Sequence, residues 1–270
     1  MPKSSWPGTS LVLALALGLS GCAGVIGGKE SVPTVETSRP PSPGTTVNLG
    51  GGSLSVVKGR PGYVIGAPHG STDSATDVIG LELARRTGFG SAVATGFGKL
   101  DTEGRRYNVN RPTESVVGAS PGSERETEAA RRVFEAYGRS VTEASQGPLR
   151  LYVEVHGNAH QDTAGRVEIA TVGLSKEDAW QVKTLLELIR DAYLRGQPET
   201  PRLEIFVEPV DTLRYSASAS KSGGMLARSE KALHVELPRV ARTTSREAYT
   251  VVLGDFLSQW ADLLTASRGR

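Results

Sequence analysis

The chain has 270 residues, of which 31 are lysine or arginine and 29 are aspartate or glutamate, so its formal charge of +2 is near balance. The basic residues are scattered rather than clustered, which gives no indication of a nucleic-acid partner. There is a single cysteine, so a disulfide within one chain is impossible.

Residues 1–21 are typical of an export signal. Residues 11–19 form an apolar run that is too short for a bilayer, which needs about 20 residues. The run ends in LSGC, which resembles a bacterial lipobox, where the cysteine is acylated and begins the mature protein. The resemblance implies a lipid anchor at Cys22 on a membrane surface outside the cytoplasm. Ala23, rather than aspartate, favours the outer membrane facing the periplasm in an organism with two membranes. The alternative is an ordinary secretory signal with an incidental cysteine.

Residues 22–55 are rich in glycine, serine, threonine and proline, with almost no apolar periodicity. Such a segment cannot bury enough apolar surface to offset its chain entropy, so we interpret it as a flexible tether. Residues 56–270 are long enough for one domain with a full core.

The pattern of residues 56–270 predicts alternating strands and helices. Helices are expected over 76–87, 124–144, 176–194 and 248–266, and strands over 56–67 (with a turn at Pro61-Gly62), 91–97, 149–155, 167–172, 203–207 and 232–237. Gly88 is expected to end the first helix, RRYNVNRPTES to lie in a loop, and the Trp180 helix face to lie in the core. This alternation favours an α/β sheet covered on both faces, whose ligands bind beyond the strand ends.

Two of the four histidines follow predicted strands, in VIGAPHG and LYVEVHG. Glycine after each histidine lets the backbone turn sharply and approach a ligand closely. His69 and Asp73 form a His-x3-Asp pair on one turn, and His156 ends the central strand. Zinc in a hydrolytic site commonly takes two histidines and a carboxylate, and a separate carboxylate handles the proton. No HExxH occurs, which excludes the helical zincin arrangement.

APHG, YNVNRP, LYVEVHGN and LHVELPRVAR are similar in order and character to motifs of N-formylglutamate amidohydrolases. The layout also resembles the wider zinc carboxypeptidase-type group, which includes phage poly-γ-glutamate hydrolases. The resemblance spans about residues 63–242 and implies a three-layer α/β/α fold with a mixed central sheet. It implies that a zinc ion is held by His69, Asp73 and His156. Asp73 stands where the poly-γ-glutamate hydrolases have glutamate, and Asp77 is an alternative ligand.

The same resemblance implies roles for residues around the metal. Asn110 and Arg111 match the pair that binds a substrate carboxylate or carbonyl oxygen, for which a guanidinium offers a fixed fork of donors. Glu236 matches the catalytic base. In KALHVELPRVAR, a period of two puts His234 and Glu236 on one side of a strand. Asn108 departs from the aspartate of the amidohydrolases, which weakens any inference to the formylglutamate substrate.

The sequence therefore predicts a zinc-dependent amidohydrolase or metallopeptidase of the cell envelope. Its substrate would be a small N-acyl amino acid, a peptide or a cell-wall peptide, cleaved at an amide next to a carboxylate. The alternative is a non-catalytic lipoprotein that uses the same fold as a binding module for cell-wall or peptide ligands. A third is a serine hydrolase built on Ser218-x-x-Lys221, a stretch that we expect instead to be a mobile loop near the pocket mouth. His160 and Asp162 are expected to be polar loop residues, or else to orient a ligand.

Overall fold

The computed structural model describes residues 44–49, 51–98, 104–116 and 123–267. The predicted export signal, the predicted lipidation site Cys22 and most of the predicted tether lie outside these residues. No helix in the described ranges is both long and apolar enough to cross a membrane.

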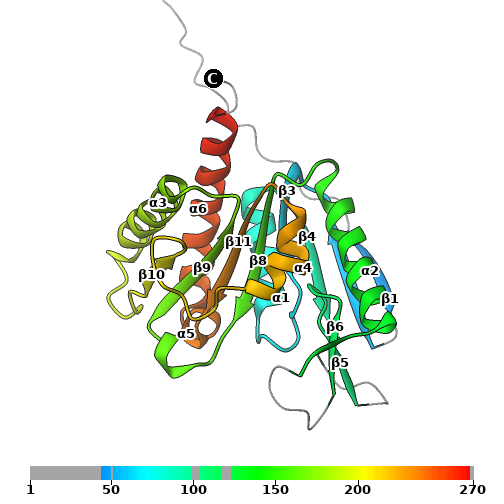
Figure 1. Cartoon of the computed structure of the whole chain (residues 1–270). Helices are drawn as coiled ribbons and strands as arrows, with labels where there is room; N and C mark the ends of the chain where they lie inside the picture. Colours follow the sequence, from blue (N-terminus) through cyan, green and yellow to red (C-terminus); the bar gives the residue numbers. More distant parts are fainter. Residues whose placement is uncertain (1–43, 50, 99–103, 117–122, 268–270) are drawn as a thin grey trace, which may run out of the picture. The chain divides into compact units, whose positions relative to one another are not determined.

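An eight-stranded mixed sheet forms the centre of the fold, which is α/β as predicted (Figure 1). The strand order is β1-β2-β4-β3-β8-β11-β9-β10. The strands are β1 (Thr45–Leu49), β2 (Gly52–Val57), β3 (Arg60–Ala67), β4 (Phe89–Thr95), β8 (Leu151–Gly157), β9 (Arg166–Val172), β10 (Glu204–Val207) and β11 (Lys231–Leu237). Neighbours β4, β3, β8 and β11 run parallel, as do β9 and β10. The pairs β1–β2, β2–β4 and β11–β9 are antiparallel.

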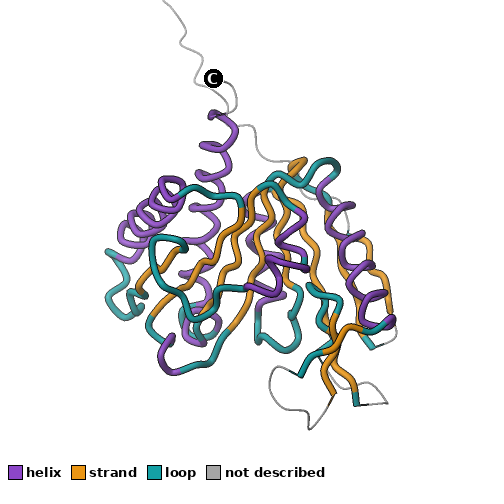
Figure 2. Tube along the Cα trace, in the orientation of Figure 1, coloured by secondary structure: helices purple, strands orange, loops and turns teal. Residues whose placement is uncertain are grey.

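Helices cover both faces of this sheet, which confirms the predicted three layers (Figure 2). Helices α1 (Thr76–Thr87), α3 (Lys176–Leu194) and α6 (Arg246–Ser267) share one apolar core with the strands. Helix α2 (Glu128–Ser145) packs into a second core on the other face. The helices bury aliphatic and aromatic side chains on each side, so the central strands lie away from water on both faces.

Helices α1 and α3 begin and end where predicted. However, some of the apolar residues expected to lie in the core are exposed. On α3, Ala179 and Leu186 lie two turns apart and are buried, whereas Trp180 is 49% exposed. One residue step turns an α-helix by about 100°, so Trp180 cannot share that stripe. Val78 and Leu81 of α1 are exposed for the same reason. The prediction that Trp180 lies in the core is wrong.

The sheet begins before the predicted domain boundary at residue 56. Strand β1 pairs with β2, and β2 pairs with β4, so residues assigned to the tether extend the sheet. Leu54 and Val56 are buried and alternate with Ser53 and Ser55. The serine- and glycine-rich composition concealed this period of two.

The segment predicted as a loop after β4 contains a second, antiparallel sheet. Its strands are β5 (Arg105–Tyr107), β6 (Thr113–Val116) and β7 (Arg125–Glu126). Three short helices or turns also line the strand ends: η1 (Gln161–Thr163), α4 (Ser218–Gly223) and α5 (Arg239–Arg242). Helix α4 occupies the place where a mobile loop was expected around Ser218.

We predict that the fragment 56–270 is less stable than the fragment 44–270, because it lacks the β1–β2 hairpin. Removing the buried Leu54 side chain alone costs about 1.5–3 kcal/mol. Chemical unfolding of the two fragments measures the difference. Equal unfolding midpoints and slopes would show that the hairpin contributes nothing to the domain.

Candidate metal centre

Strand register brings four polar residues together at the centre of the sheet. In the parallel pair β8 and β11, His156 lies beside Glu236 and Glu154 lies beside His234. Side chains alternate along a strand, so residues two apart share one face. Both strands therefore present an acid and an imidazole to the same side, near their carboxyl ends.

The turn after β3 brings a third strand end to this place. Its backbone is closed by hydrogen bonds from Asp73 N and Thr72 N to the carbonyl of His69, and Thr76 caps the carbonyl of Asp73. A Cβ on Gly70 would lie 2.8 Å from Asp77 Cβ and 2.9 Å from the carbonyl oxygen of Ala94. Only glycine fits there, because the turn packs closely against the end of β4 and the start of α1.

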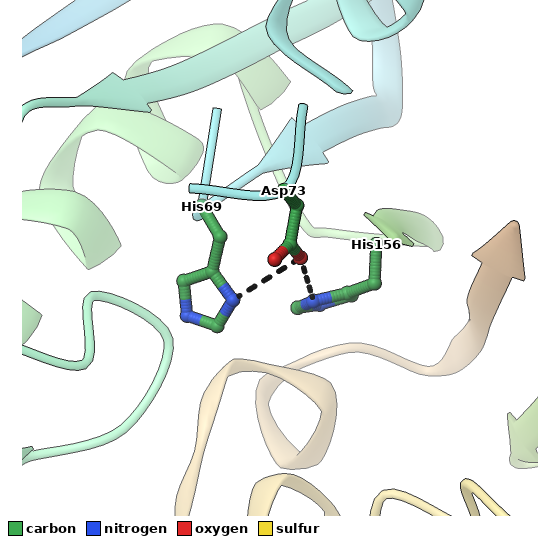
Figure 3. A group of neighbouring side chains, drawn as sticks. All are labelled: His69, Asp73 and His156. Carbon is green, nitrogen blue, oxygen red and sulfur yellow. Dashed lines mark ion pairs between the residues drawn. The ribbon is translucent and has the colours of Figure 1, made fainter. Parts of the chain in front are cut away.

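His69, Asp73 and His156 point toward one another from two separate strand ends (Figure 3). Asp73 Oδ2 lies 3.6 Å from His69 Nδ1 and 3.5 Å from His156 Nδ1. Ligand atoms of a tetrahedral zinc ion with bonds of about 2.0–2.1 Å are about 3.3–3.4 Å apart. These donors have the chemistry and spacing of a three-ligand zinc site. Asp77, the alternative ligand, is not in this group.

The outer nitrogen of His156 is held as metal-binding histidines usually are. His156 Nε2 lies 3.2 Å from Glu154 Oε2, which leaves Nδ1 facing Asp73. A carboxylate behind a histidine fixes the ring and its tautomer and strengthens it as a ligand. His69 differs, since its Nε2 is buried without a hydrogen-bond partner in the described part of the chain.

The carboxylates of this cluster are ionised, and a metal ion bound by His156 would have to replace the proton of its ring. Burial raises the pKa of the Asp73 carboxyl, but hydrogen bonds from His156 and His69 outweigh burial and hold it well below its ordinary value. Burial lowers the pKa of His156, yet hydrogen bonds to Asp73 and Glu154 outweigh it and raise that pKa to about 10. Two ionised carboxylates thus flank one imidazole, whose proton neutralises part of their charge.

Glu154 is a buried residue of this network that the sequence analysis missed. It is fully buried, and its Oε2 lies within 3.2–3.3 Å of His156 Nε2, His234 Nδ1 and Asn110 Nδ2. Its other oxygen accepts a hydrogen bond from Tyr152 at 3.2 Å. Glu154, His156 and His234 form a second group with metal-binding spacing. The lone pairs of Glu154 are already engaged by these donors, so it serves better as an anchor than as a ligand.

Glu236, the predicted base, lies at the far end of the same network. Its Oε1 is 3.1 Å from His234 Nε2, and its Oε2 is 3.5 Å from Asn158 Nδ2. Burial raises the pKa of Glu236, but the hydrogen bond from His234 and the charge of His156 lower it below the ordinary value. Glu236 lines one cavity of about 360 Å³ together with His69, Asp73 and His156. The base is therefore ionised beside the three candidate ligands.

Asn110 and Arg111 also line this cavity, but both are engaged. Asn110 donates to Glu154, so it supports the carboxylate behind His156. The Arg111 guanidinium makes two contacts with Glu124, at 2.9 and 3.1 Å, and is half-buried. Arg111 therefore reaches the cavity with its charge already paired.

The remaining candidates lie farther from the ligands. His160 and Asp162 are in neither metal-binding group, and His160 Nδ1 accepts from the backbone of Asp162, as a polar loop residue would. Ser218 lines the cavity, but Lys221 is paired with Glu208 and not with this serine. The structure therefore lacks the Ser–Lys contact that a serine hydrolase requires.

Arg242 ties the strand ends of the site together. Its guanidinium donates to three backbone carbonyls, those of Leu237 at 3.1 Å, Ser74 at 2.8 Å and Asn158 at 2.8 Å. These carbonyls follow Glu236, Asp73 and His156 by one or two residues. One buried side chain therefore fixes the spacing of three chain segments.

No protein-family model matches the chain, and no curated protein matches its sequence. The chain is similar to a solved bacteriophage poly-γ-glutamate hydrolase, with 12% identity and a TM-score of 0.47 over 80% of this chain and 93% of that one. It is similar to a metallo-carboxypeptidase from Burkholderia cenocepacia (11% identity, TM-score 0.43, 82% and 66% of the chains). A third is the CwlD amidase from Clostridioides difficile, solved with the GerS lipoprotein (13% identity, TM-score 0.37, 74% of this chain and 98% of that one). The first two are of the kinds that the sequence motifs resemble. Each likeness concerns the fold, and the function must be inferred from the site itself.

We predict that His69→Ala abolishes zinc binding and that Glu154→Gln weakens it by about 10–100-fold, the usual effect of losing a carboxylate behind a histidine ligand. Glu204→Gln, at an exposed position on β10, is the matched control and is expected to bind zinc normally. Competition with a zinc-sensitive dye measures the affinities. If Glu154→Gln binds as tightly as the parent, Glu154 has no part in orienting His156.

Proposed function

We propose that this chain is a zinc-dependent hydrolase that cleaves an amide or peptide bond. One observation carries the proposal: two histidines and an aspartate meet at zinc-ligand spacing in a cavity that an ionised glutamate also lines. Three protein ligands with one open position are typical of catalytic rather than structural zinc sites. The network behind the ligands supports the proposal, because Glu154 fixes the ring of His156 through a second hydrogen bond.

His69, Asp73 and His156 would hold the metal, which supplies an activated water and polarises the scissile carbonyl. Glu236 would accept a proton from the attacking water as the new C–O bond forms. Glu236 then returns the proton to the leaving amine as the C–N bond breaks, so the carboxylate is regenerated. His234 and Asn158 hold the two oxygens of Glu236 and fix its direction toward the cavity.

The proposed substrate is an N-acyl amino acid, a peptide or a cell-wall peptide with a carboxylate near the cleaved amide. The sequence motifs support this class through their resemblance to amidohydrolases and carboxypeptidases. The non-catalytic binding module remains the competing proposal. It is favoured by the pairing of Arg111 with Glu124, which occupies the arginine expected to receive a carboxylate.

We predict that Glu236→Gln keeps the fold and the zinc but loses about 10²–10⁴-fold in turnover, because an amide cannot accept the proton. Zinc content, thermal unfolding and hydrolysis of N-acyl amino acids and cell-wall peptides are measured on the same preparations. Zinc binding without hydrolysis of any of these by the parent protein would favour the binding module. Unchanged turnover in Glu236→Gln would show that Glu236 is a structural carboxylate.

We also propose that the protein is anchored by a lipid on Cys22, outside the cytoplasm, which the lipobox-like LSGC supports. Cys22→Ser is expected to lose incorporation of labelled palmitate and to leave the membrane fraction, because the serine cannot carry the lipid. Metabolic labelling and fractionation of cells test this. A serine variant that stays with the membrane would contradict lipid anchoring as the cause of localisation.

A further inference from the structure

A second cavity, of about 370 Å³, is lined by residues that closely follow His156 and Glu236 in the chain. Its lining includes Asn158, His160, Gln161, Arg239, Thr243 and Thr244. We call it the Arg239 cavity. The residue that joins it to the metal centre is Asn158, which follows His156 by two positions and donates to Glu236.

The Arg239 guanidinium is exposed and makes no hydrogen bond or ion pair with any described residue. It stands at the start of α5, three residues after Glu236. Arg111, the other arginine at these cavities, is paired with Glu124 through two contacts. Of the two guanidinium groups, Arg239 is the one with its donors available to a ligand.

The surroundings of Arg239 leave its positive charge uncompensated. Burial lowers the pKa of Arg242 and outweighs the charges of Asp73 and Glu236, which raise it, while the nearby charge of Arg239 lowers it further. The hydrogen bonds of Arg242 go to carbonyl oxygens and to no described carboxylate. Asp162 follows the cavity residues His160 and Gln161 in the chain. Its carboxylate oxygen Oδ2 lies 3.6 Å from the Arg214 guanidinium. The cavity therefore offers positive charge together with amide and hydroxyl groups.

We propose that the Arg239 cavity binds a carboxylate, carried by the molecule whose amide reaches the metal centre. A guanidinium presents parallel donors that match the two oxygens of a carboxylate. Asn158 lines the Arg239 cavity and donates to Glu236 of the other cavity, so an anion on Arg239 would position the rest of the molecule toward Glu236. The identity of this ligand as the substrate rests on the proposed function, whereas anion binding in the cavity does not.

The test is a ¹H–¹⁵N chemical-shift titration of the chelator-treated protein with glutarate, so that no metal competes for the probe. Saturable shifts are expected at Gln161 and Thr244, which line the cavity. Arg239→Gln is expected to weaken binding by about 10–100-fold, the usual worth of a charged hydrogen bond of about 1.5–3 kcal/mol. Arg239→Lys keeps the charge but loses the paired donors of the guanidinium. Its affinity for glutarate is expected to lie between those of the parent and of Arg239→Gln.

Arg195→Gln is the matched control, since it removes the same charge from an exposed position after α3 and is expected to bind glutarate as the parent does. Glutaramide, the neutral diamide, is expected not to bind. The proposal fails if Arg239→Gln binds normally, if Arg111→Gln abolishes binding instead, or if glutaramide binds equally well. Phosphate binding without glutarate binding would likewise overturn the carboxylate assignment. A protein that binds glutarate through Arg239 but takes up no zinc would refute the proposed function and leave the anion site standing.

Discussion

The buried carboxylate of Glu154 is the constraint on which the site depends. An ionised group without water is costly unless hydrogen bonds replace its hydration. Burial alone would raise the pKa of Glu154, but hydrogen bonds from His156 and His234 outweigh it and hold that pKa well below its ordinary value. Tyr152 satisfies the second oxygen and is itself backed by Tyr137 of α2, at 3.0 Å. The helix on one face of the sheet thus supports chemistry at the strand ends.

Around Glu154, acids and imidazoles alternate in a chain that crosses three strand ends. Asp73 contacts His156, His156 contacts Glu154, Glu154 contacts His234, and His234 contacts Glu236. Each imidazole lies between two carboxylates, so its ring has one satisfied orientation. A candidate ligand set lies at one end of this chain and the candidate base at the other.

Much of the fold could be predicted from local pattern, since the periodicity of α1 and α3 fixes their bounds and glycine marks the turn at His69. The glutamate in LYVEVHG is different. In a sheet with one solvent-exposed face, this glutamate would be an ordinary surface residue. It is buried here because helices cover both faces of the sheet. The pairing of β8 with β11 involves residues about 80 positions apart, which no local pattern encodes. No local pattern indicated that Glu124 would engage Arg111 either.

The contacts of Arg242 have a consequence for how such a site can change. Its guanidinium recognises carbonyl oxygens at Ser74, Asn158 and Leu237, so it reads the path of the backbone and not the side chains there. A Cβ on Gly157 would come within 2.4 Å of that guanidinium, so the backbone there has no room to shift toward Arg242. Side chains next to the ligands could be exchanged while the scaffold stays in place. Inserting or deleting a single residue in these segments would break it. New specificities on this frame are therefore expected to arise by substitution rather than by changes in loop length.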